Sequence, residues 1–470
     1  MFPVSQAPES PCVPIVLVDR ADWKRRREEG DTFLRHILDS SSFEGSFGQV
    51  LVVPNHNGQA HEAWAGTEKW PEDPRAHLFL GAKLAAALPG KLSFSAPAEG
   101  WSPTQSEQFS LGWGLASYQF QPYLRKKDKK TFPTLRLDER VRESKILNTL
   151  TSVKLGRDLI NTPANDLGPA ELTQKIKDLG ANHGAEVSVI KGRDLLDLNF
   201  PAIHAVGKGS KREPALVDLR WGNPDHPKLT LVGKGVVFDT GGLDLKGAAG
   251  MRLMKKDMGG AAVTTSLAGL IMSEQLPVRL RLLVPTVENS PGEEAYRPGD
   301  IIQTRKGISV EIHNTDAEGR VIMCDALTEA VSESPDLVID MATLTGACRI
   351  ALGQDLPGFW TPSDEIAAGL TEAGNEVADP LWRMPLWVPY RKMLQSPIAD
   401  LSNCASNGMA GAITAALYLH EFVKPNKNWI HMDVYGWRTE AIPGTPKGGE
   451  ATALRAVFRY LEKRFGTDRG

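Results

Sequence analysis

The sequence is poor in the residues that build covalent or cysteine-metal scaffolds. Only four of its 470 residues are cysteine, and no two of them form a C-x-x-C pair: Cys12, Cys324, Cys348 and Cys404. This scarcity excludes a disulfide-stapled domain and a cysteine zinc finger. It is typical of a protein that works in a reducing compartment.

Several catalytic motifs are also absent. The ten histidines never form H-E-x-x-H or its inverted form, and no G-x-S-x-G is present. These absences exclude a histidine zinc-protease site of that type and a serine nucleophile elbow. The stretches "GKGS" at 207–210 and "GKG" at 233–235 lack the earlier glycine of a phosphate-binding P-loop.

Long apolar runs and a strong net charge are missing too. No stretch reaches the roughly 20 apolar residues of a spanning helix, and the start of the chain has no basic region before its short apolar run at 13–18. We therefore expect no membrane segment, no signal peptide and a cytoplasmic location. The formal charge is −3 and the pI near 6.4, so peptides or small molecules are favoured over nucleic acid as partners.

The length and patterning of the chain predict two domains. β-type runs at 13–19 and 48–55, with a helix-like stretch at 75–88, indicate an amino-terminal α/β unit. The charge run at 125–130 lacks interleaved aromatics and predicts a solvated linker rather than a nucleic-acid patch. A helical pattern then ends near Pro163. We place the domains at 1–138 and 164–470, joined by an interdomain helix at 139–163.

Strand-like segments alternate with helical ones through the second domain. They are 186–192, 215–221, 228–235, 279–285, 336–344 and 429–436. This alternation predicts an α/β fold with a central mixed, mostly parallel sheet and helices on both faces. His431 and Asp433 fall on the last of these segments, and we interpret them as structural.

Two dense stretches carry the charged residues that could do chemistry. "LVGKGVVFDTGGLDLKGAAGMRLMKKDMGGAA", 231–262, contains Asp239 and Asp257 among closely spaced glycines, and "NTDAEGR", 314–320, contains Asp316 and Glu318. Side chains at i and i+2 of extended backbone project to the same side, so this pair can address one point. Loops that leave strand ends place such groups at the carboxyl edge of the sheet, where ligands bind.

The charges balance for a two-metal site. The four carboxylates supply four negative charges, which two divalent ions would neutralise, and carboxylates can bridge two ions. Of Lys234 and Lys246, one can serve as a neutral amine ligand and the other can face an oxygen that becomes anionic. Arg320 offers a fork suited to a carboxylate or a carbonate-like anion. A two-metal phosphoesterase uses similar clusters and is an alternative.

These residues resemble the leucyl aminopeptidases (cytosol aminopeptidases) of peptidase family M17. "NTDAEGR" is the signature of that family, and "VGKGVVFDTGG", "LDLK" and "MKKDMGGAA" match its metal-binding segment in order and spacing. Further matches are "GRDLINTPANDLGP" at 156–169, "MATLTGA" at 341–347 and "SPIADLSN" at 396–403. The resemblance covers residues 107–440 closely.

The resemblance implies a role for each of these side chains. The more tightly bound metal would be held by Lys234, Asp239, Asp257 and Glu318, and the more exchangeable one by Asp239, Asp316 and Glu318. Lys246 would polarise the scissile carbonyl, and Arg320 would hold a bicarbonate that acts as general base toward the bridging water. Substrate would be bound by Met254, Asn314, Thr343, Leu344 and Gly346.

The resemblance also implies an overall organisation and an activity. A small amino-terminal α/β domain would precede a larger catalytic domain, in a homohexamer that uses two zinc or manganese ions per subunit. The enzyme would release N-terminal residues from peptides, with leucine and other hydrophobic residues preferred. Because some bacterial members of the family also bind DNA, a DNA-binding side role is a second alternative, which the net charge disfavours.

Overall fold

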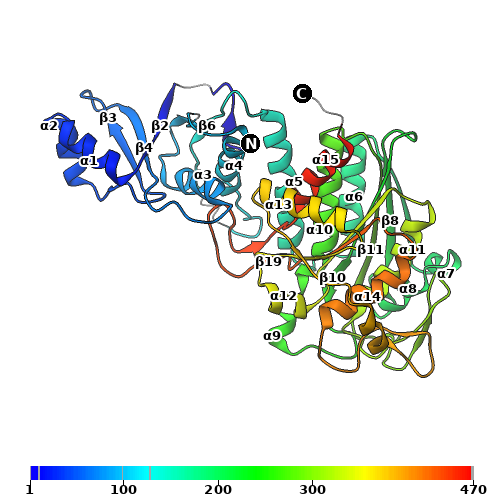
Figure 1. The fold of residues 1–470 in the computed structure, drawn as a ribbon. Helices are drawn as coiled ribbons and strands as arrows, with labels where there is room; N and C mark the ends of the chain where they lie inside the picture. The colour runs from blue at the N-terminus through cyan, green and yellow to red at the C-terminus, as the bar shows by residue number, and fades with distance from the viewer. Residues whose placement is uncertain (1, 9–10, 98, 126–128, 467–470) are drawn as a thin grey trace. The chain divides into compact units, whose positions relative to one another are not determined.

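The chain forms two compact units in a computed structural model that describes residues 2–8, 11–97, 99–125 and 129–466 (Figure 1). Unit 1 comprises Met1–Thr151 with Thr439–Lys447, and unit 2 comprises Ser152–Arg438 with Gly448–Gly470. Positions 126–128 of the charge run predicted as a linker lie outside the described residues. Within the described part, no helix has both the length and the apolar character needed to cross a bilayer.

Unit 1 is built on a six-stranded sheet in the order β1-β6-β5-β2-β4-β3. Its strands are β1 (Val4–Ser5), β2 (Cys12–Val18), β3 (Val50–Pro54), β4 (Ala60–Gly66), β5 (Ser93–Ser95) and β6 (Thr134–Arg136). All neighbours are parallel except β3 and β4, which form an antiparallel edge. The strands predicted at 13–19 and 48–55 are confirmed.

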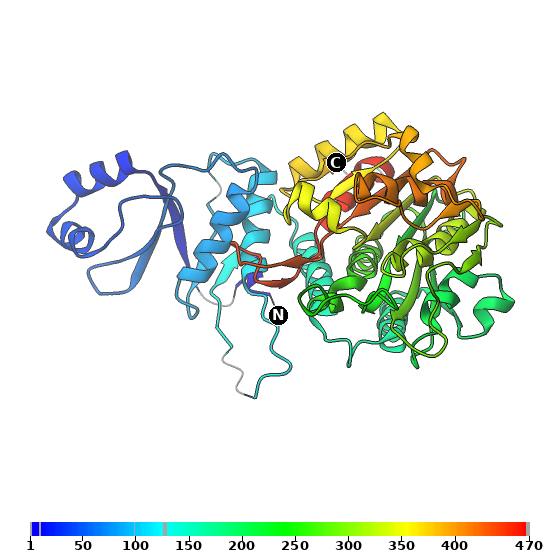
Figure 2. The same ribbon diagram turned by 90° about the horizontal axis from the view of Figure 1, so that it is seen from below.

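Helices cover this sheet and close the small core (Figure 2). They are α1 (Arg20–Glu29), α2 (Thr32–Ser40), α3 (Ala76–Ala87) and α4 (Pro103–Ala116). Trp64 and Leu38 are buried where α2 covers the β3–β4 edge. A Cβ at Gly112 of α4 would lie 1.9 Å from the backbone oxygen of Leu78 in α3, so these two helices pack backbone to backbone. The predicted long helix is α5 (Glu143–Asn161).

Unit 2 is built on a nine-stranded mixed sheet in the order β16-β15-β18-β14-β9-β11-β8-β7, with β10 beside β11. Its strands are β7 (Glu186–Lys191), β8 (Ala215–Trp221), β9 (Lys228–Gly233), β10 (Gly235–Asp239), β11 (Arg279–Asn289), β14 (Leu337–Ala342), β15 (Gly358–Trp360), β16 (Trp382–Arg383) and β18 (Trp429–Asp433). The central run β18-β14-β9-β11 is parallel, while β7, β8 and β15 join antiparallel neighbours. The predicted mixed, mostly parallel sheet is confirmed.

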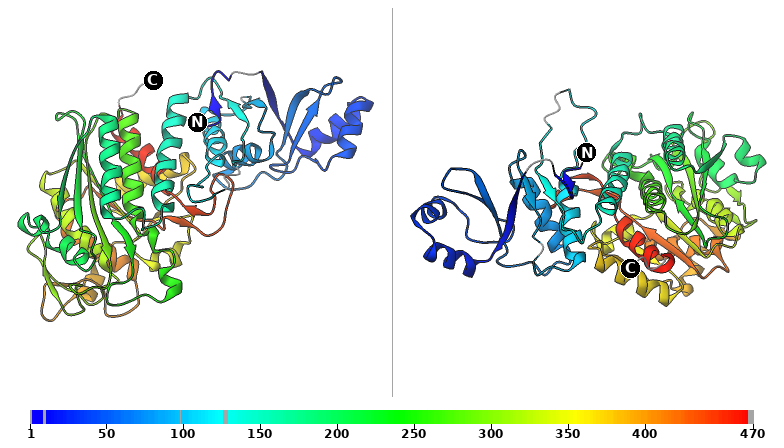
Figure 3. Two further views of the ribbon diagram at one scale, coloured as in Figure 1. Left: turned by 180° about the vertical axis from the view of Figure 1, so that it is seen from behind. Right: turned by 90° about the horizontal axis from the view of Figure 1, so that it is seen from above.

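Both faces of this sheet carry helices (Figure 3). One face is covered by α6 (Pro169–His183) and α10 (Gly259–Ser273), with α15 (Leu454–Phe465) packed on α10. The other is covered by α8 (Pro201–Gly207), α11 (Glu318–Ser332) and α14 (Gly411–Val423). Since helices shield both faces, β14 and β18 are buried along their whole length.

Shorter elements complete unit 2. They are α7 (Asp194–Asp197), α9 (Ala248–Met251), α12 (Gly346–Leu352), α13 (Asp364–Glu376), the 3-10 helices η1 (Met254–Met258) and η2 (Val388–Leu394), and the strands β12 (Ile301–Gln303), β13 (Ser309–Glu311), β17 (Leu401–Ser402), β19 (Trp437–Arg438) and β20 (Gly448–Gly449). Strand β17 lies parallel to β13, which brings the segment after residue 401 beside the loop that precedes α11.

Candidate active site

The acidic side chains expected to bind metal lie where strands of unit 2 end and helices begin. Asp239 is the last residue of β10, and Asp257 lies in η1, directly before α10. Glu318 is the first residue of α11, and Asp316 stands in the loop before it. This is the carboxyl edge of the parallel strands, at which open α/β sheets bind their ligands.

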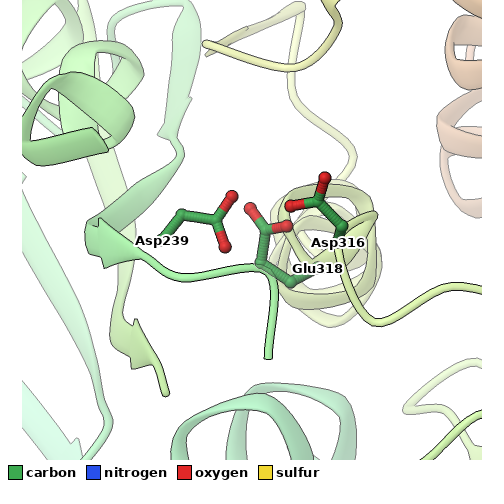
Figure 4. Close-up of side chains that lie close together, drawn as sticks. All are labelled: Asp239, Asp316 and Glu318. Atoms are coloured by element: carbon green, nitrogen blue, oxygen red, sulfur yellow. The ribbon is translucent and has the colours of Figure 1, made fainter. Parts of the chain in front are cut away.

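Three of these carboxylates point toward one another (Figure 4). Asp239, Asp316 and Glu318 can each offer an oxygen within 4.8 Å of the other two. Asp239 is 2% and Glu318 1% exposed, whereas the Asp316 side chain is 33% exposed. Carboxylates this close, two of them shut off from water, require positive charge among them.

Lys234, between β9 and β10, supplies part of that charge. Its Nζ donates to the Thr343 backbone oxygen at 2.9 Å and lies 2.7 Å from Asp257 Oδ2 and 2.9 Å from Glu318 Oε1. By distance these are ion pairs, yet neither carboxylate oxygen has a partner with hydrogen-bond geometry among the described residues. The opposite charges attract, and both oxygens keep lone pairs available to a metal.

Lys246 supplies charge on the opposite side of Asp239. Its Nζ lies 2.8 Å from Asp239 Oδ2 and also contacts Asp316 Oδ1. Burial lowers the pKa of Lys234 and of Lys246, but the surrounding carboxylates outweigh it and hold both pKa values above the ordinary lysine value. Both lysines are therefore ammonium groups when no metal competes for the same oxygens.

The acids themselves are strongly perturbed. Burial, followed by the charge of Asp257, raises the pKa of Asp239 to about 6. Burial and the charge of Asp239 raise the pKa of Glu318 well above its ordinary value. Burial acts in the same direction on Asp257, but the Lys234 and Lys256 ammonium groups bring its pKa below the usual range. Burial thus favours the protonated form of Asp239 and Glu318. Together with Lys234, these acids offer oxygen and nitrogen donors, a set that fits divalent ions.

Neighbouring groups fix the orientation of Asp239. The Asn289 side chain, at the end of β11, donates to Asp239 Oδ1 at 2.7 Å, and the Gly241 backbone N–H donates to the same oxygen at 2.9 Å. The second oxygen is left to face Lys246 and the other carboxylates. Orienting hydrogen bonds of this kind are typical of metal ligands.

The loop 314–317 differs from the sequence prediction in its backbone. We expected extended backbone at Asp316 and Glu318. Instead Asn314 Oδ1 accepts a hydrogen bond from the Asp316 backbone N–H at 2.7 Å, which closes a turn, and α11 begins at Glu318. The two carboxylates converge because a turn meets a helix, so the alternation argument was wrong even though the convergence is present.

Gly319 leaves room for Lys234. A Cβ at Gly319 would lie 2.5 Å from Lys234 Cε and 2.7 Å from its Nζ. Real Cβ atoms do not approach other carbons this closely. The glycine of "NTDAEGR" therefore allows the buried lysine to pass beside the first turn of α11.

Asn403 ties the same loop down from outside. Its Oδ1 accepts hydrogen bonds from the backbone N–H groups of His313 at 2.8 Å and Asn314 at 3.2 Å, and its Nδ2 donates to the Asn314 oxygen at 2.7 Å. Its backbone oxygen accepts from the Arg320 guanidinium at 2.9 Å. One asparagine after β17 thus holds both the loop and the arginine.

Arg320 is a buried cation with spare donor capacity. It is 7% exposed, burial lowers its pKa, and its Nε has no hydrogen-bond partner among the described residues. An arginine in this condition suits a small anion. Arg320 and Asn314 are not among the residues that line the cavity described next, whereas the other predicted site residues are.

A cavity of about 500 Å³ opens on the carboxylates. Its lining includes ten residues expected from the sequence: Lys234, Asp239, Lys246, Met254, Asp257, Asp316, Glu318, Thr343, Leu344 and Gly346. The loop 343–346 is held by Asp433, which accepts hydrogen bonds from the backbone N–H groups of Leu344 at 3.0 Å and Thr345 at 3.3 Å. The interpretation of Asp433 as structural agrees with these bonds.

Some residues of the cavity were missed by sequence reasoning. Lys256, Arg349 and Tyr435 line it, yet they come from η1, from α12 and from the segment after β18. A signal for Lys256 was available, because it adjoins Asp257 in the glycine-rich stretch. Asn403 stands in "SPIADLSN", a segment that the sequence matched without assigning a role.

Comparison with a model of the cytosol aminopeptidase family, catalytic domain, finds a match over residues 154–458. A probable cytosol aminopeptidase of Syntrophotalea carbinolica is 40% identical over 475 residues, covering 95% of each chain. Peptidase B of Pectobacterium atrosepticum is 40% identical over 363 residues, covering 74% of this chain and 83% of that one.

Solved structures agree with these relatives. The cytosol aminopeptidase from Coxiella burnetii superposes with a TM-score of 0.92 at 44% identity, covering 98% of this chain and 99% of that one. The bottromycin maturation enzyme BotP in complex with Mn gives 0.86 at 29% identity, covering 96% and 99%. The resemblance drawn from the sequence is confirmed. With a family model matched across most of unit 2 and a relative this similar over almost its full length, the chain belongs to the cytosol aminopeptidase family.

Proposed function

We propose that this chain is a metal-dependent aminopeptidase that releases N-terminal residues from peptides, leucine and other hydrophobic residues among them. The observation that carries the proposal is the convergence of four carboxylates and two lysines on one cavity of unit 2, in a chain of the cytosol aminopeptidase family. The chemistry resides wholly in the proposed catalytic domain, 164–470, since every residue of the cavity lies within it.

Two divalent ions, zinc or manganese, are proposed to bind the carboxylates. Lys234, Asp239, Asp257 and Glu318 would hold one ion, and Asp239, Asp316 and Glu318 the other. Support comes from Asp257 Oδ2 and Glu318 Oε1, which both lie within 2.9 Å of Lys234 Nζ and accept no hydrogen bond of regular geometry from the described residues. It also comes from the cluster of Asp239, Asp316 and Glu318, whose ligand oxygens lie within 4.8 Å of one another. When bound, such ions supply Lewis-acid polarisation of a carbonyl and lower the pKa of a water.

Lys246 and Arg320 are the proposed catalytic side chains. Lys246 is a partly exposed ammonium at the mouth of the cluster, so it can donate to a substrate carbonyl oxygen and stabilise the negative charge that develops there. Arg320 is proposed to hold bicarbonate, which would accept a proton from the attacking water. Its guanidinium is buried, and its Nε has no hydrogen-bond partner in the part of the chain that the structure describes, which supports that proposal.

The substrate is proposed to lie along the loop after β14. Thr343, Leu344 and Gly346 offer backbone groups, and Met254 offers an apolar wall for the first side chain. Asn314 is proposed to contribute to substrate binding by holding the loop before α11 in place, since its side chain accepts a hydrogen bond from the Asp316 backbone N–H. A homohexameric assembly and a cytoplasmic location are proposed on the family resemblance. Nothing in the comparisons supports the phosphoesterase or DNA-binding alternatives.

The test compares a ligand variant with a surface variant. Asp257→Asn should remove bound metal and abolish hydrolysis of leucine p-nitroanilide. Asp364→Asn, which alters a 91% exposed carboxylate on α13, should do neither. Metal content by plasma mass spectrometry and turnover after loading with zinc or manganese are the readouts. Full turnover in Asp257→Asn would show that the site is assigned wrongly.

A further inference from the structure

Part of the cavity wall carries positive charge that the metal ligands do not use. Lys256 of η1, Arg349 of α12 and Tyr435 all line the cavity. Lys256 Nζ lies 4.9 Å, and Arg349 Cζ 5.3 Å, from the centre of the Tyr435 ring. The Arg349 guanidinium also donates to the Tyr435 hydroxyl at 3.5 Å. One aromatic ring therefore gathers two cations from distant parts of the chain.

Lys256 is a buried cation without a counter-ion of its own. It is 7% exposed, and its ammonium forms no ion pair or hydrogen bond with any residue that the structure describes. The contact with the Tyr435 ring offsets only part of the cost of burying a charge. A buried charge in a cavity wall that lacks a partner within the protein favours an anionic ligand in the cavity.

The neighbouring carboxylates are engaged elsewhere. Asp433 accepts hydrogen bonds from the Leu344 and Thr345 backbone and, at 2.6 Å, from Thr345 Oγ1. Asp257 pairs with Lys234 and accepts from Thr343 Oγ1 at 2.9 Å. Their fields reach Lys256 through space, but neither acid is paired with it. The charge of Arg349 likewise faces an aromatic ring rather than a carboxylate.

A neutral donor lies in the same cavity wall. Thr452 lines the cavity, and its hydroxyl oxygen has no hydrogen-bond partner among the described residues. Met254 adds an apolar surface to this lining. The combination of an apolar surface with cations and a hydroxyl suits a side chain that has a hydrocarbon stem and a carboxylate end.

Building on the proposed aminopeptidase function, we propose that Lys256 and Arg349 form a subsite for the side-chain carboxylate of an N-terminal glutamate or aspartate. Arginine binds a carboxylate through its planar fork, and lysine does so as a point charge. A leucine side chain ends about where the carboxylate of glutamate begins, so it uses the apolar part alone. The enzyme therefore accepts acidic first residues in addition to hydrophobic ones.

The test uses p-nitroanilides of glutamate, glutamine and leucine with the manganese-loaded enzyme. Glutamine has the shape of glutamate without its charge, so the glutamate-to-glutamine ratio of kcat/KM isolates the charge. We expect a ratio of about ten to a hundred, the strength of hydrogen bonds to charged groups. Lys256→Met and Arg349→Met should each lower that ratio toward one. Anilides carry no C-terminal carboxylate, so the far end of a peptide cannot produce the effect.

Lys255→Met is the matched control. Lys255 adjoins Lys256 but donates to the Asn161 backbone oxygen and does not line the cavity, so its substitution should keep the wild-type ratio. Calorimetric titration with L-glutamate and L-glutamine gives a second readout, in which glutamate should bind more tightly to the wild type and lose that advantage in both cavity variants.

The outcomes separate the subsite from the activity. Turnover of leucine anilide with a glutamate-to-glutamine ratio at or below one, or a ratio that neither cavity variant changes, overturns the subsite and leaves the aminopeptidase intact. Loss of turnover of all three anilides overturns the aminopeptidase, and the calorimetric comparison then still decides whether the cations bind an acidic side chain.

Discussion

Replacing Gly319 by alanine should displace Lys234 from the metal-binding carboxylates. The added Cβ would lie 2.5 Å from Lys234 Cε, 2.7 Å from Nζ and 2.8 Å from Cδ. Carbon atoms in contact rest about 3.5–4.0 Å apart, so the end of the lysine must move by about 1 Å. Lys234 is 3% exposed and its Nζ donates a hydrogen bond to the Thr343 backbone oxygen, so the displacement moves the Nζ away from that oxygen and from the carboxylates of Asp257 and Glu318.

The magnitude follows from that displacement. A shift of about 1 Å in a catalytic constellation costs about a hundredfold in rate, so kcat/KM for leucine p-nitroanilide should fall by about that factor. Overpacking costs about 1–3 kcal/mol, and alanine recovers about 1 kcal/mol of helix propensity over glycine. The free energy of unfolding should therefore fall by at most about 2 kcal/mol, and the variant remains folded.

The control is a second helical glycine, chosen so that an added Cβ would meet only the flexible end of a side chain. Gly269 of α10 is suitable, because a Cβ there would meet only the end of the Leu179 side chain, at 3.2 Å. Gly269→Ala should keep the metal content and kcat/KM of the wild type, whereas Gly319→Ala should bind less metal and show a kcat/KM about a hundredfold lower. A Gly319→Ala enzyme with full metal content and kcat/KM within twofold of the wild type would refute the packing argument.

Two further predictions concern residues that position the site and that stabilise unit 1. Asn403→Ala removes the side-chain hydrogen bonds to the loop before α11. It should lower the free energy of unfolding, measured in urea, by about 1–3 kcal/mol, and should also lower kcat/KM. An unchanged kcat/KM would show that the loop keeps its position without Asn403. In unit 1, hydrogen bonds from Arg140 lower the pKa of Asp138 from 3.8 to about 2. A carboxyl group whose pKa is lowered by folding stabilises the fold at pH values above its unfolded-state pKa. This stabilisation is lost as the pH falls through the folded-state pKa of about 2. Arg140 is 42% exposed, so solvent screening leaves about 1–2 kcal/mol. Asp138→Asn should be less stable than the wild type by that amount at pH 7, with the gap narrowing toward pH 3; a gap that does not change with pH would contradict the ion-pair origin.

Elements with strong periodicity were predictable from the sequence. The strands that became β7, β8, β9, β11, β14 and β18 stand where alternating or continuous apolar runs predicted them. The helical pattern predicted to end near Pro163 is present as α5, which ends at Asn161. Strands that helices bury on both faces appear in the sequence as continuous apolar runs, so they can be predicted from local pattern alone.

The start of α11 was harder to predict because its turn depends on a partner far along the chain. Asn314 closes the turn locally, but Asn403 holds the loop from 89 residues away. Arg349 and Tyr435 were missed for the same reason, since they share no local motif with Lys256 and meet it only in the lining of the cavity. By contrast, Asp239 and Asp257 could be recognised from the sequence, because closely spaced glycines beside them indicate backbone that turns tightly next to a ligand.

The central claim is that Lys234 and the four carboxylates bind two metal ions. Its most direct test is an anomalous difference map from crystals of the manganese-loaded protein, recorded at a wavelength where manganese scatters anomalously. The account predicts two peaks, one among Lys234, Asp239, Asp257 and Glu318 and one among Asp239, Asp316 and Glu318. A map with no peak at Asp239, in crystals that bind manganese elsewhere, would contradict it.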